Sequence, residues 1–525
     1  PHPPRRAGTL RSGYAGGGWG SPNLPQREAR LMALSAAPRT VGGPLATSGH
    51  ELASLFGGQL IVDGDKPIRG CAVDSRLVVP GQLFLALPGE KTHGIRHAVE
   101  ALRAGATAIV VEGGDATDET RQVLAEVELA TQAAGASLIG VESGRVALSR
   151  AATDWRSRFT IEVIGVTGSV GKTTTKQFIA AALGGETAGC AATPGNANNE
   201  IGLPMSLLNL PDGTMRFVAE MGMYVEGDIR ELCTMARPRI GVVTAIDAVH
   251  AERAGDIDAI ERGKGELVEA LPPEGWAILA ADDRRVARLA ARTPARSRTA
   301  GHAATADVRI VEATLDEALG HTIVTLEIRT ETVRVDLPLF GLQFAKAAAL
   351  AIAAADLCGV APSEAAARLE SVQLPSGRAT VRMMSGIRVI DDAYNAAPTS
   401  MLAALATLQA CRPRRFAALG AMGELGTYAT DAHLAIGHAA ATSGLELLIV
   451  FGSEADGIAE GARAGGMPIE KIMRLSSDAA GITAAIGLLG DMASVGDTIL
   501  VKASRSVALE RLVDGLAARW SEVPK

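Results

Sequence analysis

Residues 161–183 read IEVIGVTGSVGKTTTKQFIAAAL, and this stretch decides the fold of the central part of the chain. The segment 161–167 is an apolar run rich in β-branched residues, which predicts a buried strand. The run that begins at Lys172 predicts a helix, and a glycine-rich turn joins the two. Because the N–H groups of such a turn and the positive end of the helix dipole both attract anions, the stretch predicts a phosphate-binding loop.

The residues of this loop have separate tasks in phosphate binding. Lys172 is expected to neutralise the β- and γ-phosphates of a nucleotide, and the hydroxyl of Thr173 is expected to reach a Mg²⁺ ion. In the general form of this loop a glycine stands where this chain has Val166. We expect the nucleotide to contact Gly168, Ser169, Gly171, Lys172, Thr173 and Thr174.

Strand-like and helix-like segments alternate along most of the chain, which is typical of parallel sheets covered by helices. In such sheets, ligand sites lie at the carboxyl ends of the strands. An alanine-rich run that begins at Ala347 is interrupted by Asp356, so we interpret it as a buried helix rather than a membrane span. Strands are predicted at 82–87, 107–112, 161–167, 215–221, 239–246, 276–281, 388–394, 415–422, 445–452 and 497–504, and a further helix at 96–104.

The length of 525 residues suggests about three domains. Residues 1–45 are rich in Pro, Gly, Arg and Ser, and we expect a disordered extension, with Met32 as a candidate start of translation. We place a small α/β domain at 46–142, a larger one at 143–370 and a third at 371–525. The predicted fold class is therefore α/β in three domains with mostly parallel sheets.

Composition and charge exclude several classes of protein. Hydrophobic residues make up 47% and charged residues 21% of the chain, as in folded globular proteins. The net charge of -7 argues against a surface for nucleic acid or for an anionic membrane. The five cysteines are scattered, which favours reduced thiols over a zinc site or disulfides. We expect a cytoplasmic monomer with no nucleic-acid partner and no membrane insertion.

Motifs along the chain resemble those of the Mur ligase family, and in particular of its MurF type. They occur in the family's order and span about residues 70–515. The segment DDAYNAAP at 391–398 is similar to the one that separates this type from its relatives. The other similar segments are DSR at 74–76, GNANNEIGLP at 195–204, EMGM at 220–223, EGDI at 226–229, RGKGE at 262–266, LGAMGELG at 419–426 and VKASRS at 501–506.

The resemblance implies an N-terminal UDP-binding domain, a central P-loop ATPase domain and a C-terminal Rossmann-like domain. It also implies ATP-dependent ligation of D-alanyl-D-alanine to a UDP-N-acetylmuramoyl-tripeptide, which is a step of peptidoglycan precursor synthesis. The peptide carboxylate is expected to attack the γ-phosphate of ATP, and the amine of the dipeptide then displaces phosphate from the acyl phosphate. Two Mg²⁺ ions are expected beside ATP.

The same resemblance assigns roles to individual residues. Glu220 and His250 each follow a predicted strand of the phosphate-loop sheet, and with Thr173 they are the expected Mg²⁺ ligands. Lys264 is expected to be carbamylated, which turns a cation into a metal-binding carboxylate. Arg378 is expected to approach the γ-phosphate, since a guanidinium can bind phosphate through two N–H groups. The expected nucleotide contacts from the last domain are Asp392 and Asn395, and the expected substrate contacts are Asp74, Ser75, Arg76, Asn198, Asn199, Lys502, Ser504 and Arg505.

Two alternatives remain open at this level. One is a Mur ligase that adds diaminopimelate or lysine, although the DYAH-type and DNPR-type motifs of that type are absent from the sequence. The other is a paralogue that binds nucleotide without catalysing ligation. The reason to consider a non-catalytic paralogue is that the sequence departs from the family pattern near the expected adenine site and in the last domain. These departures are Ala280, Gln343, Ala347, Ala397 and Ala421. Folate polyglutamylation would leave the N-terminal uridine-nucleotide domain unexplained.

Overall fold

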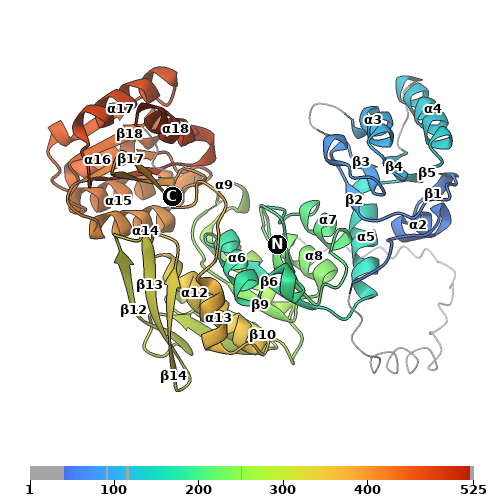
Figure 1. Ribbon diagram of the computed structural model, residues 1–525, viewed down its shortest axis with the longest axis horizontal. Helices are drawn as coiled ribbons and strands as arrows, with labels where there is room; N and C mark the ends of the chain where they lie inside the picture. Colours follow the sequence, from blue (N-terminus) through green and yellow to red (C-terminus); the bar gives the residue numbers. More distant parts are fainter. Residues whose placement is uncertain (1–40, 90–92, 114–117, 250, 521–525) are drawn as a thin grey trace, which may run out of the picture. The chain divides into compact units, whose positions relative to one another are not determined.

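The structure is a computed structural model that describes residues 41–89, 93–113, 118–249 and 251–520 (Figure 1). Most of the segment expected to be disordered, 1–45, lies outside these residues. Its end at 41–45 differs from the expectation, because Val41 and Leu45 are buried. The N–H of Leu45 donates to the carbonyl of Ile68 over 2.8 Å. The folded part of the chain therefore begins before the expected boundary at residue 45.

A five-stranded sheet forms the N-terminal part of the described chain, in the order β1-β5-β4-β3-β2. β1 pairs antiparallel with β5, and the other pairs are parallel. The strands predicted at 82–87 and 107–112 are confirmed as β3 and β4, and the predicted helix at 96–104 is mainly α3. The elements are α2 (Gly49–Phe56), β1 (Gln59–Val62), β2 (Cys71–Ala72), β3 (Leu83–Ala86), α3 (Ala98–Arg103), β4 (Ala108–Glu112), α4 (Asp118–Ala133), β5 (Ser137–Val141) and α5 (Gly144–Ser157).

A nine-stranded sheet forms the centre of the chain, in the order β14-β13-β12-β11-β10-β9-β6-β8-β7. The strands from β7 to β12 of this order run parallel, and β6 lies between β8 and β9, with Ile164 opposite both Val218 and Ile240. The strands are β6 (Glu162–Thr167), β7 (Cys190–Ala192), β8 (Arg216–Glu220), β9 (Ile240–Val243), β10 (Trp276–Ala280), β11 (Arg296–Gly301), β12 (Val308–Asp316), β13 (His321–Ile328) and β14 (Glu331–Leu337). The helices are α6 (Lys172–Ala182), α7 (Gly202–Leu208), α8 (Asp228–Ala236), α9 (Ala251–Ala254), α10 (Ile257–Glu269), α11 (Arg284–Arg288), α12 (Phe344–Leu357) and α13 (Pro362–Leu369).

The edge of this sheet at β12–β14 is an antiparallel meander that the sequence did not predict. Every second residue of β13 is buried, which is the pattern of a sheet with one covered face. The residues Ala347–Ala355 of α12 are all buried, and α12 packs against α6 and against β10, β11 and β12. The interpretation of the alanine-rich run as a buried helix is therefore confirmed.

A six-stranded sheet forms the C-terminal part, in the order β15-β16-β20-β17-β18-β19. Only the β15–β16 pair is antiparallel in this sheet. The strands are β15 (Thr380–Met384), β16 (Ile387–Asp392), β17 (Arg415–Gly420), β18 (Leu447–Phe451), β19 (Ile472–Leu475) and β20 (Thr498–Lys502). The helices are α14 (Pro398–Ala410), α15 (Ala429–Thr442), α16 (Asp456–Ala464), α17 (Ala479–Met492) and α18 (Glu510–Arg519).

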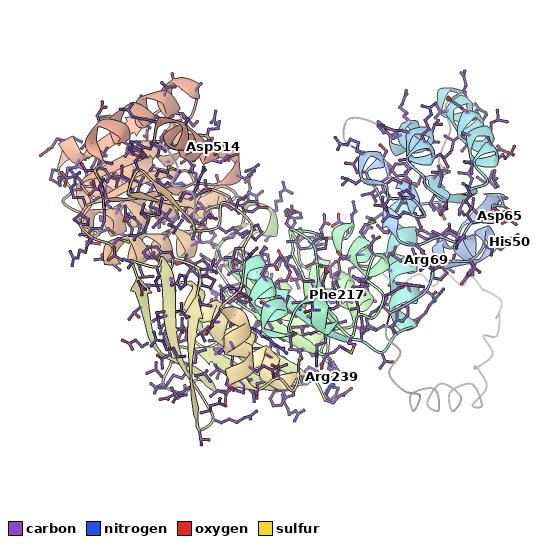
Figure 2. All side chains as sticks on the ribbon, in the orientation of Figure 1. His50, Asp65, Arg69, Phe217, Arg239 and Asp514 are labelled. Carbon is purple, nitrogen blue, oxygen red and sulfur yellow. The ribbon has the colours of Figure 1, made fainter. Side chains whose placement is uncertain are left out.

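These sheets confirm the predicted α/β class with mainly parallel strands (Figure 1). Phe217, the second residue of β8, is labelled in Figure 2 and is 1% exposed, as expected for a strand of a covered sheet. Glu220 ends β8, and Asp392 and Lys502 end β16 and β20, so that these polar residues lie at the carboxyl ends of parallel strands. Within the described ranges, no helix is both long enough and apolar enough to cross a bilayer.

Candidate active site

The phosphate loop joins β6 to α6 and is held against the end of β9. Gly168 has a φ of 150°, and a Cβ placed there would lie 2.0 Å from Oγ1 of Thr244, so that only glycine fits. Gly171, with a φ of 82°, is the N-terminal cap of α6. The N–H of Ser169 donates to the carbonyl of Ala245 over 2.8 Å. These contacts shape the loop around the N-terminus of α6, where phosphate oxygens bind.

The ammonium of Lys172 lies over this loop. Nζ donates to the carbonyls of Gly168 (2.7 Å) and Ser169 (3.3 Å). Burial lowers the pKa of Lys172, and Glu220 opposes this effect. Charged phosphate oxygens are stronger acceptors than carbonyls, so a nucleotide can take over these N–H groups. The position is the one expected for a lysine that contacts phosphates.

Glu220 is 1% exposed and lies beside the loop. Its Oε1 accepts hydrogen bonds from Oγ1 of Thr173 (3.2 Å) and from Nδ2 of Asn198 (2.8 Å). Its Oε2 forms an ion pair with Nζ of Lys176 at 3.2 Å, yet this oxygen accepts no hydrogen bond. A carboxylate with a free lone pair beside a hydroxyl is a hard oxygen donor set, and such a set fits Mg²⁺.

The rest of a metal site is not made by acidic or histidine side chains of the described chain. In those residues no group of three or more His, Cys, Asp or Glu could hold a metal ion. His250, the other expected ligand, lies outside the described residues. Magnesium at nucleotide sites takes one or two protein ligands and completes its shell with phosphates and water. Glu220 and Thr173 therefore meet this requirement.

Lys264 lies on α10 and is 2% exposed. No hydrogen bond or ion pair to its Nζ occurs within the described residues. Burial lowers the pKa of Lys264 well below its usual range, and the nearby charge of Lys172 lowers it further. A lowered pKa raises the fraction of the amine in its neutral, nucleophilic form, which is the form that reacts with carbon dioxide.

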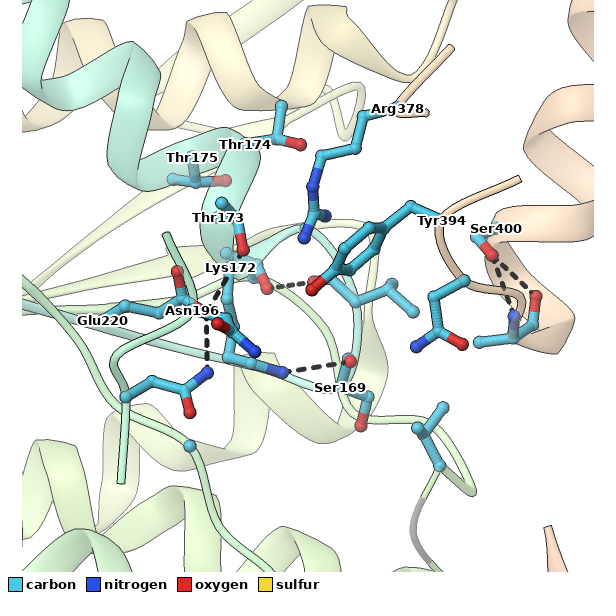
Figure 3. Close-up of a pocket in the computed structure, with 18 of the residues that line it drawn as sticks. Ser169, Lys172, Thr173, Thr174, Thr175, Asn196, Glu220, Arg378, Tyr394 and Ser400 are labelled. Atoms are coloured by element: carbon cyan, nitrogen blue, oxygen red, sulfur yellow. Dashed lines mark hydrogen bonds between the residues drawn. The ribbon is translucent and has the colours of Figure 1, made fainter. Parts of the chain in front are cut away.

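Arg378 approaches the cleft from the segment before β15. Its Cζ lies 4.2 Å from the centroid of the Tyr394 ring, a cation–π contact that orients the guanidinium (Figure 3). Its Nε is buried and has no hydrogen-bond partner in the described chain. A buried donor without an acceptor is costly, so this guanidinium is suited to receive an anion. Figure 3 shows it on the side of the cleft where Lys172 and Thr173 lie.

Lys502 is 2% exposed at the end of β20. Its Nζ donates to Oδ2 of Asp392 (2.6 Å) and to the carbonyl of Asn395 (3.0 Å). The other oxygen of Asp392 accepts the N–H of Ala379 over 3.1 Å. Lys502 was expected to contact a substrate. In the structure its ammonium is bound by Asp392 and Asn395, which were expected to contact the nucleotide. Lys502 is buried and Asp392 is half-buried, so their attraction is screened less than in water, which explains the pairing.

A single cleft of ≈ 720 Å³ brings most of the expected residues together, from both the central and the C-terminal sheets. This volume is in the range of sites for small molecules and cofactors. Of the residues expected from the sequence, those that line it are Ser169, Gly171, Lys172, Thr173, Thr174, Asn198, Asn199, Glu220, Arg378, Asp392, Asn395 and Lys502. Gly168 and Lys264 are not among the described residues that line it.

The expected uridine-nucleotide residues lie on the N-terminal sheet and do not line this cleft. Arg76 forms hydrogen bonds of 2.8 and 2.5 Å to the carboxylate of Asp74, and these hold the pKa of Asp74 at about 2. Oγ of Ser75 donates to Oε2 of Glu100 over 3.0 Å. The three residues therefore form a local turn whose charged groups are paired with each other.

Three other expected substrate residues have structural partners. Oδ1 of Asn199 accepts the N–H groups of Ile201 and Gly202 at the start of α7, so its side chain caps that helix. Ser504 is buried, and its N–H donates to the carbonyl of Ala421 over 2.9 Å. Exposed Arg505 pairs with Glu510 at 3.2 Å and does not line the cleft. These contacts are all within the chain, and the substrate roles expected for the three residues stay predictions.

Two residues at the site were missed by the sequence reasoning. Lys176 is fully buried behind Glu220, and Asp247 contacts the phosphate loop, since its N–H donates to Oγ of Ser169 over 2.8 Å. A lysine one turn beyond Lys172 on the buried face of a helix is a signal that could have identified Lys176. Nothing in the sequence marks Asp247, because its partners come from distant segments.

Comparison with protein families finds three domain matches, which cover most of residues 67–505. The Mur ligase family catalytic domain matches residues 67–156, the Mur ligase middle domain matches 166–355, and the Mur ligase glutamate ligase domain matches 377–505. The middle-domain match contains the phosphate loop and Glu220, and the third match contains Arg378, Asp392 and Lys502.

Individual relatives cover most of the chain. The UDP-N-acetylmuramoyl-tripeptide–D-alanyl-D-alanine ligase of Synechocystis sp. is 36% identical over 458 residues, which are 86% of this chain and 93% of that protein. The protein of the same name from Mycobacterium tuberculosis is 34% identical over 480 residues, with coverages of 85% and 91%. The crystal structure of MurF from Acinetobacter baumannii has a TM-score of 0.76 at 25% identity and covers 90% of this chain and 98% of its own. MurF from Thermotoga maritima, solved in complex with ADP, has a TM-score of 0.72 at 28% identity, with coverages of 86% and 97%.

The fold and the site thus define an ATP-dependent ligase with a P-loop, built from three α/β parts. The chain belongs to the Mur ligase family, and within that family to the MurF type.

Proposed function

We propose that this chain joins D-alanyl-D-alanine to the peptide carboxyl group of a UDP-N-acetylmuramoyl-tripeptide. The carboxylate oxygen attacks the γ-phosphorus of ATP, the bond to ADP breaks, and an acyl phosphate forms. The amine nitrogen of the dipeptide then attacks the acyl carbon, phosphate leaves with the bonding electrons, and the nitrogen loses a proton. The names of the Synechocystis and Mycobacterium tuberculosis relatives support this choice of substrates.

The observation that carries the proposal is the convergence of cations on one cleft. The attacking carboxylate and the triphosphate repel each other, so their approach requires positive charge fixed in place beforehand. Lys172 supplies it from the phosphate loop, and Arg378 supplies it from the segment before β15 with an unpartnered Nε. A simple binding module would have no need for a buried guanidinium donor without an acceptor.

We propose Glu220, Thr173 and His250 as ligands of two Mg²⁺ ions, which add positive charge at the phosphates when they are bound. We further propose that Lys264 is carbamylated. The burial of its amine and the lowered pKa support this, because a carbamate would place a carboxylate-like group beside the cation of Lys172.

The substrate contacts expected from the sequence remain proposals. Asp74, Ser75 and Arg76 are assigned to the uridine nucleotide, and Asn198 faces the cleft beside Glu220. Lys502 and Arg505 are the cations that we propose for the carboxylate of the dipeptide: Lys502 lines the cleft and is paired with Asp392, and exposed Arg505 is paired with Glu510.

The test is a phosphate-release assay on the full chain with ATP, Mg²⁺, bicarbonate and UDP-muramoyl-tripeptide, in which only the amine varies. We expect release with D-alanyl-D-alanine and little release with diaminopimelate or lysine on the dipeptide acceptor. A Lys172→Ala preparation gives the background rate.

Each other outcome identifies a different error. Faster release with diaminopimelate or lysine would assign the chain to another amine-adding Mur ligase. No stimulation by any acceptor or amine would make the chain a nucleotide-binding paralogue. Release without any acceptor would indicate a simple ATPase.

We also propose that the chain acts as a cytoplasmic monomer. All five cysteines are free, as is usual in a reducing compartment. One chain supplies both the phosphate loop and the cations from the C-terminal sheet, so the cleft needs no second copy. Size-exclusion chromatography with light scattering tests the oligomeric state, and a stable dimer would contradict it.

A further inference from the structure

Lys176 lies on α6, one helical turn beyond Lys172, and its side chain is fully buried. Its Nζ donates hydrogen bonds of 2.7 Å to the carbonyls of Thr193 and of Gly195. The remaining side of the ammonium faces Oε2 of Glu220 at 3.2 Å. A buried ammonium is stable only when its charge and its N–H groups have partners, so these contacts hold Lys176 in one position.

The partners of Lys176 come from two further segments at the edge of the cleft. Thr193 and Gly195 belong to the loop after β7, and Glu220 ends β8. Oγ1 of Thr193 accepts the N–H of Glu220 over 3.0 Å. The same loop carries Asn198, whose Nδ2 donates to the other carboxylate oxygen of Glu220. One ammonium therefore ties α6, this loop and the end of β8 together, and both carboxylate oxygens are oriented by the result.

The place of Lys176 differs from that of Lys172. Lys172 lines the cleft, whereas Lys176 is absent from the lining formed by the described residues. Lys176 therefore cannot touch a nucleotide in the cleft, and any influence on bound phosphate passes through Glu220. A compact ammonium on a long stem suits this task, because its three N–H groups can point to three different segments.

We propose that Lys176 is a positioning residue for the Mg²⁺ site. It holds the carboxylate of Glu220 so that Oε1 stays with Thr173 and Asn198 and the free lone pair of Oε2 keeps its direction. This rests on the proposed role of Glu220 as a Mg²⁺ ligand. Without Lys176 the carboxylate can turn about its last bond, and Mg²⁺ binding weakens while the phosphate loop stays intact. Partners of metal ligands typically change metal affinity by roughly tenfold to 100-fold.

The test is calorimetric titration of the full chain with ADP, once in EDTA and once in MgCl₂. In Lys176→Met, which keeps the apolar stem but lacks the charge, we expect ADP affinity in EDTA close to that of the wild type. We expect the tightening caused by Mg²⁺ to fall by roughly tenfold or more. Lys471→Met, which removes a part-exposed lysine paired with Glu446, is the matched control and should change neither value.

A second pair of variants keeps the test valid if Lys176→Met does not fold. The double variant Lys176→Met/Glu220→Gln removes both charges and so leaves no unpaired buried charge, and Glu220→Gln alone is measured beside it. If Lys176 acts through Glu220, the double variant binds Mg²⁺ as weakly as Glu220→Gln alone. The proposal is overturned if Mg²⁺ increases the ADP affinity of Lys176→Met as much as that of the wild type. It is also overturned if this increase is a further tenfold smaller in the double variant than in Glu220→Gln. If Mg²⁺ increases the ADP affinity of Glu220→Gln as much as that of the wild type, the proposal is overturned as well, but the outcome of the ligation assay is not affected.

Discussion

Asp247, in the loop after β9, accepts two hydrogen bonds from Thr399 near the start of α14, one from its Oγ1 (2.6 Å) and one from its N–H (3.2 Å). The N-terminal cap of α14 is Ala397, whose side chain has no acceptor for these N–H groups. The carboxylate that caps this helix therefore comes from the central sheet. The backbone N–H of Asp247 also donates to Oγ of Ser169, so Asp247 contacts both the phosphate loop and α14.

Removing the carboxylate of Asp247 is expected to destabilise the fold and to remove its hydrogen bonds to Thr399 in the C-terminal part. Asp247→Ala should lower the free energy of unfolding by about 1 kcal/mol, as for other helix caps. In a double-mutant cycle with Thr399→Val, measured by urea unfolding, the two changes should couple by about 0.5 kcal/mol or more. Asp256, which caps α10 by accepting the N–H of Ala259 at 2.7 Å, is the control. Asp256→Ala should lower the free energy of unfolding by a similar amount, and its effect should simply add to that of Thr399→Val. If the effects of Asp247→Ala and Thr399→Val are also fully additive, the interpretation is contradicted.

Lys172→Ala is expected to abolish ligation without unfolding the chain. Among the described residues, Nζ of Lys172 bonds only to loop carbonyls, so its loss removes charge from the phosphates rather than support from the core. Turnover should fall by roughly a factor of 100 or more, as when a fixed electrostatic contact to the reacting group is removed. Initial-rate phosphate release measures this, with circular dichroism as the check on folding. Retention of more than about a tenth of the wild-type rate would count against the phosphate-loop assignment.

Lys264 is expected to carry a carbamate that depends on pH. The neutral amine is the reactive form, and burial lowers the pKa of Lys264, so the modification should form at a lower pH than on an exposed lysine. As the pH falls through that lowered pKa the amine is protonated, and both the carbamate and the activity should be lost. Carbon-13 NMR with labelled bicarbonate should show a carbamate signal that is absent from Lys264→Ala. That variant should be inactive and partly rescued by short carboxylates, whereas full activity with an unmodified Lys264 would refute the proposal.

Lys502 is expected to act mainly on stability through Asp392. Lys502→Met leaves the half-buried Asp392 carboxylate without its cation, so the free energy of unfolding should drop by roughly 3 kcal/mol, the lower end for a broken buried pair. Asp392→Asn in the same chain should restore part of the loss, because it removes the stranded charge. The control is Arg505→Met, which breaks an exposed pair with Glu510 and should cost less than about 1 kcal/mol. A similar small loss for Lys502→Met would show that the Asp392 pair is not desolvated.

Local chemistry explains which features were predictable. The phosphate loop was predictable because its glycines, its lysine and its threonine lie within one short segment between a strand and a helix. The α/β class followed from the alternation of apolar strands with helices, and the buried helix at α12 followed from its composition. Relatives of the chain could be identified for the same reason, since each motif is contiguous in sequence.

Contacts between distant segments were decided only by the tertiary structure. The order of the central sheet places β6 between β8 and β9, and this order brings Glu220 and Asp247 to the phosphate loop. The antiparallel meander β12–β14 and the pairing of Lys502 with Asp392 depend likewise on which strands become neighbours.

The sequence by itself therefore determined the class of fold, the phosphate loop and the candidate residues at the carboxyl ends of the strands. The tertiary structure decided which of those residues share a hydrogen bond or a charge partner, including the burial of Lys176 against Glu220. The physical reason is that strand and loop propensities act over a few neighbouring residues. The partner of a buried charge is instead selected by desolvation among all the groups that the sheet order brings within reach.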